Sequence, residues 1–324
     1  MSTTVPRRAR PGTVVCVGES MMLCLSTRPG RLRHATTLEV KVAGAESNVA
    51  IALSRLGHDA RWVSLLGDDE PGQVVLDRVR AEGVDTSWVR RVPDLPTGLM
   101  LRDQVGGSAR VTYYRAGSAA SSLAPDAVDL ACLDGASWLL LSGITPALSP
   151  GCAKLVPWLA WAARERGVRV AYDVNHRTKL WAPAPARAFT DQLLPHVDLL
   201  LVGTDEGARL WDWDDDERQA RRLAAAGPAE VVLKRGANGA AAWADDRFWE
   251  SPPAVVTEVD AIGAGDAFAA GYLSAHLDGL GVADRLRTAG ATGAMCVREP
   301  GDYEGLPDRR ELDDFLNDRT DPGR

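Results

Sequence analysis

Short apolar segments alternate with amphipathic segments along most of the chain, and this alternation restricts the fold more than any other feature. Apolar runs typical of buried strands lie at 13–17, 62–66, 138–142, 168–173, 198–202 and 230–234. Segments with apolar residues at helical spacing lie at 45–56, 72–82, 149–166 and 217–226. Such alternation is typical of a parallel sheet covered by helices on both faces. We therefore predict an α/β fold with a central, mostly parallel sheet flanked by helices.

Two segments interrupt this pattern. Residues 97–104 and 110–115 alternate in side-chain character around Gly106-Gly107, which indicates a β-hairpin. Together with 37–42 they can form a small sheet that is too thin to bury both of its faces. We predict a β-sheet lid, formed by segments near 20–43 and 97–115, over the carboxyl edge of the main sheet, where α/β proteins bind ligands. The whole chain, 1–324, is expected to be a single domain of this kind.

Composition excludes several classes of partner. The net charge of the 324-residue chain is −7, and no basic run is long enough to follow a phosphate backbone, so we expect no nucleic acid. Apolar runs such as 197–202 are far shorter than the roughly 20 residues that cross a bilayer, so we expect no membrane span. The Arg- and Pro-rich residues 1–12 do not resemble a signal peptide. Five scattered cysteines lack metal-ligand or redox spacing, and predict reduced thiols in a cytoplasmic protein.

The segment Gly263-Ala264-Gly265-Asp266 is the strongest candidate for chemistry. It precedes an apolar helical segment at 267–275, and glycines at a helix start let backbone N–H groups converge on an anion. Asp266, in the first turn, would be ionised at neutral pH and could take the proton of an alcohol aimed at a phosphoryl group. A purely structural helix cap would leave the same pattern. No Walker-type phosphate loop occurs in the chain, and a dinucleotide fingerprint fits poorly.

Two longer motifs identify the chain as similar to a known family. One runs from Gly44-Ala45-Glu46-Ser47-Asn48 into Leu53-Ser54-Arg55-Leu56-Gly57, and the other covers 260–270. They resemble both signatures of the ribokinase-like (pfkB) carbohydrate kinases, and the likeness extends from about Val14 to Phe315. Within that family, 113–119, 141–149 and 173–177 look most like the 2-keto-3-deoxygluconate kinases. The resemblance implies a ribokinase-like fold and ATP-dependent phosphorylation of that sugar acid to its 6-phosphate.

A sugar acid carries a carboxylate, and two arginines fit that ligand. The planar guanidinium groups of Arg115 and Arg177 can clamp a carboxylate with two hydrogen bonds. Because side chains alternate along a strand, we expect Tyr113 to share a face with Arg115, and Asp173 and Asn175 to share one with Arg177. Each arginine taken alone is more often a surface or structural group, but two at strand ends that face one cleft favour a substrate role.

The resemblance also implies the roles of individual residues. Asp266 is the implied general base, with Gly263, Ala264 and Gly265 as the anion hole. Implied substrate-binding residues are Gly44, Asn48, Met100, Tyr113, Tyr114, Arg115, Arg177, Asp266 and Asp302. Implied nucleotide-binding residues are Asn175, Arg177, Lys234, Gly236, Ala237, Gly239, Gly263, Gly265 and Gly290. Glu206 would hold Mg²⁺ through water, although Gly203 replaces the usual Asn before it. A K⁺ site is implied beside Ala261-Ile262, where this chain departs from the usual residues.

Some alternatives stay open at this point. Met100 stands where the sugar-acid kinases carry a Tyr, so a neutral sugar such as fructose or ribose is an alternative substrate. A sensor that binds sugar or nucleotide without catalysis is a further alternative, although it would need no base at Asp266. A nicotinamide-dependent oxidoreductase is a third. Apolar lid residues such as Leu99 and Val111 predict a homo-oligomer that pairs through the lid.

Overall fold

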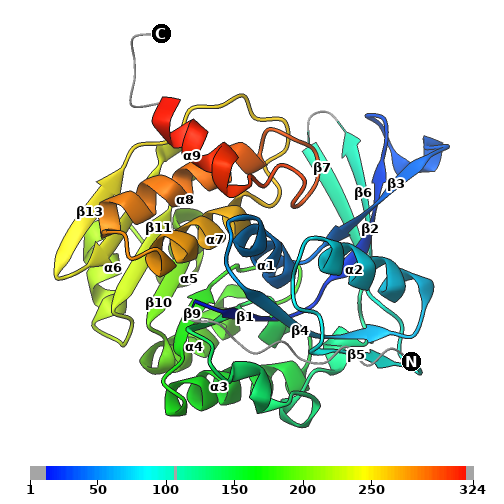
Figure 1. Cartoon of the computed structure of the whole chain (residues 1–324), viewed down its shortest axis with the longest axis horizontal. Coiled ribbons are helices and arrows are strands. Elements are labelled where there is room, and N and C mark those ends of the chain that lie inside the picture. The colour runs from blue at the N-terminus through cyan, green and yellow to red at the C-terminus, as the bar shows by residue number, and fades with distance from the viewer. Residues whose placement is uncertain (1–11, 106–107, 319–324) are drawn as a thin grey trace.

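A nine-stranded, mostly parallel sheet forms the centre of the protein, with strands in the order β13-β12-β11-β10-β9-β8-β1-β4-β5 (Figure 1). The computed structural model describes residues 12–105 and 108–318. The strands are β1 (Val14–Val17), β4 (Ala60–Gly67), β5 (Val89–Val92), β8 (Trp138–Ser142), β9 (Arg169–Asp173), β10 (Leu199–Gly203), β11 (Glu230–Lys234), β12 (Ala240–Ala244) and β13 (Arg247–Ser251). Only β12 and β13 run antiparallel to their neighbours among these strands. The predicted fold class is confirmed.

Helices cover both faces of this sheet. One face packs against α1 (Ala45–Arg55), α2 (Glu70–Ala81), α7 (Ala264–Leu277) and α8 (Val282–Cys296). The other packs against α3 (Pro150–Glu165), α4 (Pro183–Leu193), α5 (Thr204–Trp211) and α6 (Asp216–Ala224). The last helix, α9 (Arg309–Asp318), lies against α8. No helix in the described part of the chain is both long and apolar enough to cross a membrane.

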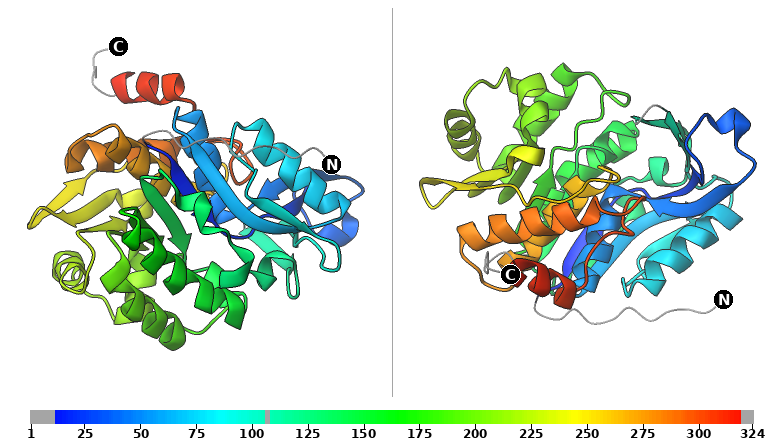
Figure 2. Two further views of the ribbon diagram at one scale, coloured as in Figure 1. Left: turned by 60° about the horizontal axis from the view of Figure 1, so that its bottom comes forward. Right: turned by 90° about the horizontal axis from the view of Figure 1, so that it is seen from above.

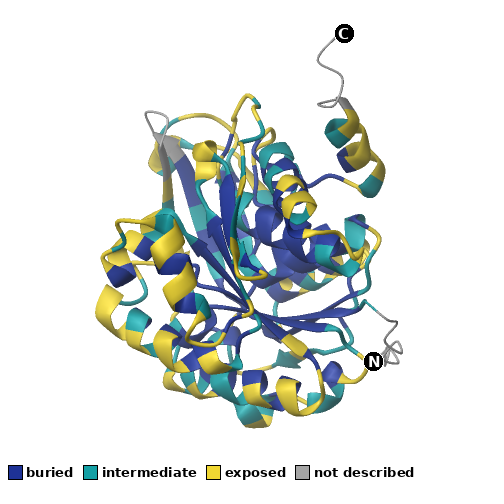
Figure 3. Ribbon diagram, turned by 90° about the vertical axis from the view of Figure 1, so that its left-hand side faces the viewer, coloured by how far each residue is buried: buried dark blue, intermediate teal, exposed yellow. Residues whose placement is uncertain are grey.

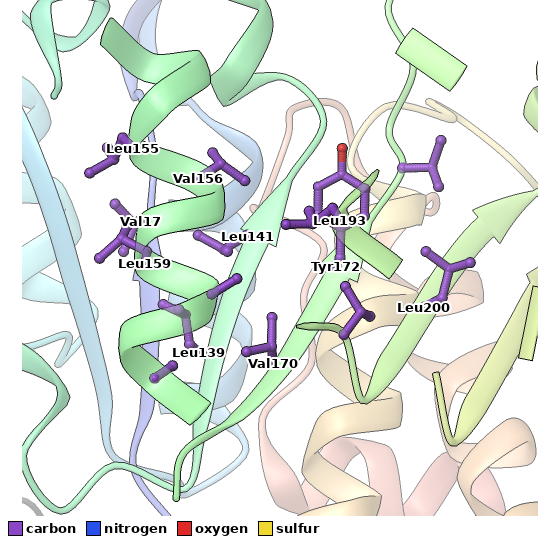
Figure 4. Close-up of a cluster of buried hydrophobic side chains, with 14 of the residues drawn as sticks. Val17, Leu139, Leu141, Leu155, Val156, Leu159, Val170, Tyr172, Leu193 and Leu200 are labelled. Atoms are coloured by element: carbon purple, nitrogen blue, oxygen red, sulfur yellow. The ribbon is translucent and has the colours of Figure 1, made fainter. Parts of the chain in front are cut away.

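The inner strands of the sheet are buried on both faces because they are apolar at consecutive positions. In β1, Val15 and Val17 belong to one hydrophobic cluster, and Val14 and Cys16 belong to the cluster on the opposite face. Figure 3 shows the inner strands of the sheet largely buried, whereas exposed residues gather on the outer helices. Figure 4 shows how Leu155 and Leu159 of α3 pack beside Leu139 and Leu141 of β8. These runs are the signature that parallel strands leave in a sequence.

A separate four-stranded sheet, in the order β3-β2-β6-β7, lies to one side of the central sheet (Figure 2). We call it the small sheet. It consists of β2 (Met21–Ser26), β3 (Leu38–Ala43), β6 (Leu99–Val105) and β7 (Ser108–Tyr114). Its strands fall within the segments predicted for the lid, while Gly106-Gly107 lie outside the described residues. Cross-strand partners share a face, so Leu23, Met100 and Tyr113 lie on one face and Cys24, Leu99 and Tyr114 on the other.

Sequence patterns located some elements less well than others. The helix predicted at 267–275 begins at Ala264 and ends at Leu277, which places Asp266 inside its first turn. Strand β12 was not predicted, because its sequence, Ala-Ala-Ala-Trp-Ala, has little intrinsic preference for a strand. Antiparallel pairing with β11 and β13 stabilises it in the folded chain.

Candidate active site

A cleft of about 1350 Å³ lies between the small sheet and the carboxyl ends of the central strands. Met100 and Tyr113 line it from the small sheet, and Gly203 and Lys234 line it from the ends of β10 and β11. The cleft brings together almost all of the predicted site residues: Gly44, Asn48, Met100, Tyr113, Arg115, Asn175, Arg177, Glu206, Lys234, Gly236, Ala237, Gly239, Gly263, Ala264, Gly265, Asp266, Gly290 and Asp302. Residues from both halves of the chain therefore meet at one place.

The amino end of α7 lines this cleft and is its candidate anion-binding surface. Gly263 caps the helix with a φ of 84°, and a Cβ atom at this position would lie only 2.0 Å from the carbonyl oxygen of Asp302. Both the backbone conformation and the close approach therefore require glycine. The N–H groups of the first turn lack carbonyl partners within the helix, so they can bind a negatively charged group.

Asp266 is buried in this first turn, with a relative exposure of 8%. Its Oδ2 accepts a hydrogen bond of 2.9 Å from Nδ2 of Asn48 on α1. Burial raises the pKa of Asp266 to about 6, while the Asn48 hydrogen bond and the positive charges of Arg177 and Lys234 oppose that rise. The carboxyl group is thus poised to gain or lose a proton close to neutral pH, as a general base must.

A partly buried lysine, held by a buried carboxylate, places a positive charge beside the helix start. Nζ of Lys234, at the end of β11, donates to both carboxylate oxygens of Asp173 at 2.7 and 2.8 Å. The same ammonium group lies 3.6 Å from the point where a Cβ atom of Gly265 would be. Burial alone would lower the pKa of the Lys234 ammonium group. The negative charges of Asp173 and Glu206 outweigh this effect and raise the pKa. Lys234 is therefore charged beside the anion-binding surface.

The loop after β11 offers backbone rather than side chains to the cleft. Gly236 and Gly239 have positive φ angles of 55° and 88°, and a Cβ atom at Gly239 would lie 2.2 Å from the carbonyl oxygen of Ser251. Gly290 lines the cleft from α8 and has open space where a Cβ atom would project. A flat ligand group can approach the backbone closely between these segments.

Two arginines lie on the other side of the cleft, in different environments. Nε of Arg115, just beyond β7, donates to Oε2 of the buried Glu19 at 2.6 Å, and Oγ of Ser118 donates to the other oxygen of Glu19, also at 2.6 Å. Arg177 is exposed, and no hydrogen bond or ion pair engages its guanidinium group in the described structure. Arg115 is thus held in one orientation, whereas Arg177 is available to a ligand.

Two predictions about this region were wrong. Tyr114 does not line the cleft and is 60% exposed, because neighbouring residues of β7 point to opposite faces and Tyr113 takes the inner one. Strand alternation also fails to explain how Asn175 and Arg177 reach the cleft. Strand β9 ends at Asp173, and Asn175 has a φ of 38°, so a turn carries both residues there.

Glu206 performs a structural task within the cleft. Its Oε1 accepts the N–H of His176 at 2.9 Å, and its Oε2 accepts the N–H of Gly203 at 2.8 Å, which caps α5. Each oxygen keeps a lone pair for a further donor or for water. No cluster of three or more acidic, His or Cys side chains in the described structure could hold a metal ion directly. A hydrated cation, held mainly by other ligands, still fits this carboxylate.

Sequence reasoning missed several buried charges around the cleft. Glu46, within the first motif, accepts hydrogen bonds from Ser142 and Thr145 at 2.6 and 2.8 Å, and burial raises its pKa to about 7. Glu19 was not singled out either. For Arg102, the available signal was strand periodicity, because it lies two residues after Met100 and therefore on the same inward face.

The fold and this cleft together define a class of protein. The N–H groups at the start of α7, with the ammonium group of Lys234 beside them, suit a phosphoryl group, and the adjacent carboxylate suits an acceptor hydroxyl. Both lie where the carboxyl edge of an α/β sheet meets a second sheet that can exclude water. These properties belong to a phosphotransferase.

Comparison with known proteins assigns the family. The family model for pfkB family carbohydrate kinases matches residues 12–309, so the chain belongs to that family and is a sugar kinase. It is 37% identical over 308 residues to the 2-dehydro-3-deoxygluconokinase of Bacillus subtilis (strain 168), which covers 94% of this chain and 95% of that protein. It is 36% identical over 294 residues to a 2-dehydro-3-deoxygalactonokinase of Haloferax volcanii, covering 89% and 92%.

A solved structure shows the same fold. A putative ribokinase II from E. coli, in complex with ATP and Mg²⁺, superposes with a TM-score of 0.89. It is 23% identical and covers 95% of this chain and 99% of that one.

The pKa of Asp266 predicts a pH dependence for this enzyme. A carboxyl group accepts a proton only in its ionised form, so turnover should be constant at high pH and fall about tenfold per pH unit below about 6. The hydrogen bond from Asn48 lowers the pKa of Asp266, so Asn48→Ala should move this fall to higher pH. Turnover measured between about pH 5 and pH 8 checks both expectations. Asn317→Ala, in α9, is the control. If the turnover of the wild type did not change with pH, Asp266 could not be the general base.

Proposed function

We propose that the protein transfers the γ-phosphoryl group of ATP to the 6-hydroxyl of 2-keto-3-deoxygluconate, also called 2-dehydro-3-deoxygluconate. One observation carries the proposal: Arg115, Arg177 and the buried carboxylate of Asp266 line the same cleft. A sugar acid needs a basic group for its carboxylate and a base for its hydroxyl, and this cleft offers both. The kinase from Bacillus subtilis, at 37% identity over nearly the whole chain, supports the same substrate.

The proposed reaction forms one bond and breaks another. The sugar hydroxyl oxygen bonds to the γ-phosphorus, the bond from that phosphorus to the β–γ bridging oxygen breaks, and ADP leaves with the electron pair. Asp266 orients the hydroxyl and receives its proton late, because a loose transition state needs little nucleophilic push. The N–H groups of Gly265 and Asp266, with the ammonium group of Lys234, stabilise the charge on the transferring group.

The ATP base and ribose would lie on the opposite side of the helix start from the sugar. The loop of Lys234, Gly236, Ala237 and Gly239 and the open surface at Gly290 line the cleft and would hold this part of ATP, with Asn175 and Arg177 between the two substrates. Mg²⁺ is the proposed cofactor, and the remaining lone pairs of Glu206 fit one of its water ligands. Its chemistry is to neutralise charge on the phosphate oxygens when ATP is bound.

The sugar acid would lie beneath the small sheet. Arg177 is free to bind its carboxylate, while Glu19 holds Arg115 in position for a second contact. Gly44, Asn48, Tyr113 and Asp302 also line the cleft and would bind hydroxyl groups, as sugar recognition requires. Met100 cannot donate a hydrogen bond there. The apolar side chain of Met100 favours a second candidate function: phosphorylation of a neutral sugar such as fructose or ribose by a kinase of the same family.

A substrate panel tests the proposal directly. We expect purified enzyme with Mg²⁺ and ATP to release ADP fastest with 2-keto-3-deoxygluconate, more slowly with its 4-epimer, and least with fructose or ribose. Asp266→Asn should lower turnover by roughly 10²-fold or more without changing ATP binding, because it removes the general base. Faster turnover of a neutral sugar would keep the kinase and reject the substrate. ATP and sugar binding without ADP release would favour a sensor instead.

A charge reversal tests the carboxylate contact. Arg177→Glu should raise the KM for the sugar acid by roughly 10- to 100-fold, which is the value of a charge-assisted hydrogen bond. It should change the KM for a neutral sugar much less. Arg187→Glu on α4, outside the cleft, is the matched control. Equal loss for acidic and neutral sugars would mean that Arg177 does not recognise the carboxylate.

We also propose that two copies of the chain pair through the outer face of the small sheet. Tyr114 and Leu38 expose 60% and 41% of their surface there, beside the partly exposed Leu99 and Cys24. Edge strands and exposed apolar groups of this kind are commonly covered by a partner.

Light scattering on a size-exclusion column tests the pairing. The wild type should have the mass of a dimer, and Tyr114→Glu should shift it toward the monomer, because a buried charge without a partner is unfavourable in an interface. Trp161→Glu on α3, where Trp161 is 51% exposed away from the small sheet, should leave the mass unchanged. A monomeric wild type would reject the proposal.

A further inference from the structure

Arg102 is completely buried, with a relative exposure of 0%. It lies on β6 of the small sheet, on the inner face that also carries Met100. Its Nη2 forms an ion pair with Asp260, and its Nη1 lies 3.7 Å from Oδ1 of Asp302. Both carboxylates are distant in sequence and belong to the segments around the start of α7. A fully buried arginine is rare unless it is paired, so this cluster joins the small sheet to the anion-binding helix start.

Asp260 fixes the turn that leads into that helix. Its Oδ1 accepts the N–H of Ile262 at 3.2 Å, and its Oδ2 accepts the N–H of Gly301 at 3.0 Å as well as the guanidinium group of Arg102. All of these neighbours are donors. The side chain of Asp260 therefore sets the path of the backbone just before Gly263, and with it the direction of the first-turn N–H groups.

Asp302 forms the other half of the cluster. Its carbonyl oxygen lies against Gly263, and its side chain lines the cleft. Burial raises the pKa of Asp302 to about 7, against the opposing charge of Arg102. Oδ1 of Asp302 and Nη1 of Arg102 have no hydrogen bond in the described structure, although they face each other. A shift of about 0.5 to 1 Å would bring them within hydrogen-bonding distance.

A second residue of the small sheet contacts the same loop. Nζ of Lys41, on β3, donates to the carbonyl oxygen of Pro300 at 2.8 Å and lies 3.3 Å from Oε1 of Glu304. The loop that carries Asp302 is therefore attached to the small sheet at two points, one on β3 and one on β6.

A monovalent cation does not fit beside Asp260 in this chain. The family resemblance implied a K⁺ site next to Ala261-Ile262, where the negatively charged oxygen donor is Asp260. Its carboxylate is already surrounded by the guanidinium group of Arg102 and two N–H groups. A cation there would meet a fixed positive charge at short range in a buried site, which is strongly unfavourable.

We propose that Arg102 is a built-in cation: a positioning residue that orients the anion hole at Gly263–Asp266 and makes phosphoryl transfer independent of K⁺. The proposal rests on the proposed phosphoryl transfer, but not on which sugar is the acceptor. It deepens the role of the small sheet, because the charge that orders the anion hole comes from the sheet that covers the cleft.

Exchange of monovalent cations tests the proposal in the full-length enzyme. Turnover of the wild type should change less than about twofold when K⁺ is replaced by tetramethylammonium at equal ionic strength. Arg102→Met should lower turnover roughly 10²-fold in tetramethylammonium, the order of effect seen when an oxyanion contact is lost. Replacing tetramethylammonium by K⁺ should raise the turnover of Arg102→Met about tenfold, because Asp260 no longer has an arginine partner and can bind K⁺. Arg102→Lys, which keeps the charge, should stay insensitive to K⁺.

Thermal unfolding gives a second readout that needs no substrate. Because a ligand that binds only the folded state stabilises it, K⁺ should raise the Tm of Arg102→Met relative to tetramethylammonium but leave the wild-type Tm unchanged. Arg61→Met is the matched control. Arg61 is a buried arginine on β4, outside the cleft, that donates to the carbonyl oxygen of Cys132 at 2.6 Å. Its loss should lower the Tm without creating any response to K⁺.

The outcomes separate this inference from the proposed function. A wild type whose turnover or Tm depends on K⁺ overturns the inference, and so does an Arg102→Met enzyme that is indifferent to K⁺ in both measurements. If Arg102→Met does not fold, the wild type and Arg102→Lys test the proposal. A turnover or Tm that depends on K⁺ in either protein contradicts it. If the wild type phosphorylates no sugar, the proposed function fails, while the Tm comparison still tests the built-in cation.

Discussion

Burial of charged groups at the carboxyl edge of the central sheet is the constraint on which the rest of the structure depends. Each ion removed from water costs about several kcal/mol unless another charge or a hydrogen bond compensates. Asp266, Asp173 and Glu19 are buried here, and each has a partner from a distant part of the chain. The cluster is stable only when the sheet, α7 and the small sheet are all in place. The site and the fold therefore depend on each other.

The same burial gives the site its chemistry. A carboxylate in water has a pKa near 4 and is a weak base, whereas desolvation raises the pKa of Asp266 to about 6. Asn48 and Lys234 limit this rise, so that the group is still mostly ionised near neutral pH. The balance matters because desolvation alone would leave the carboxyl group protonated, while full solvation would weaken it as a base.

Sequence patterns predicted the α/β fold, the small sheet and most of the cleft residues, because these depend on periodicity and on glycines that need particular backbone angles. They failed where contacts join distant segments. Tyr114 was misplaced because a motif does not reveal which face of a strand turns inward. Arg102 was missed because a charged residue in a strand usually faces water. Periodicity from Met100 gives its inward face, but only the structure shows that Asp260 and Asp302 compensate its charge. Likewise, no sequence signal shows that Glu19 holds Arg115.

The position of these buried charges links the small sheet to the start of α7 in this chain even before any substrate binds. Helix starts bind anions only when their N–H groups converge, and a glycine-rich turn has too much backbone freedom to converge unaided. In this chain Asp260 restrains the turn, and Asp260 in turn needs a positive partner because it is buried. Since that partner comes from β6, the covering sheet acts on the floor of the cleft through the protein interior as well as from above.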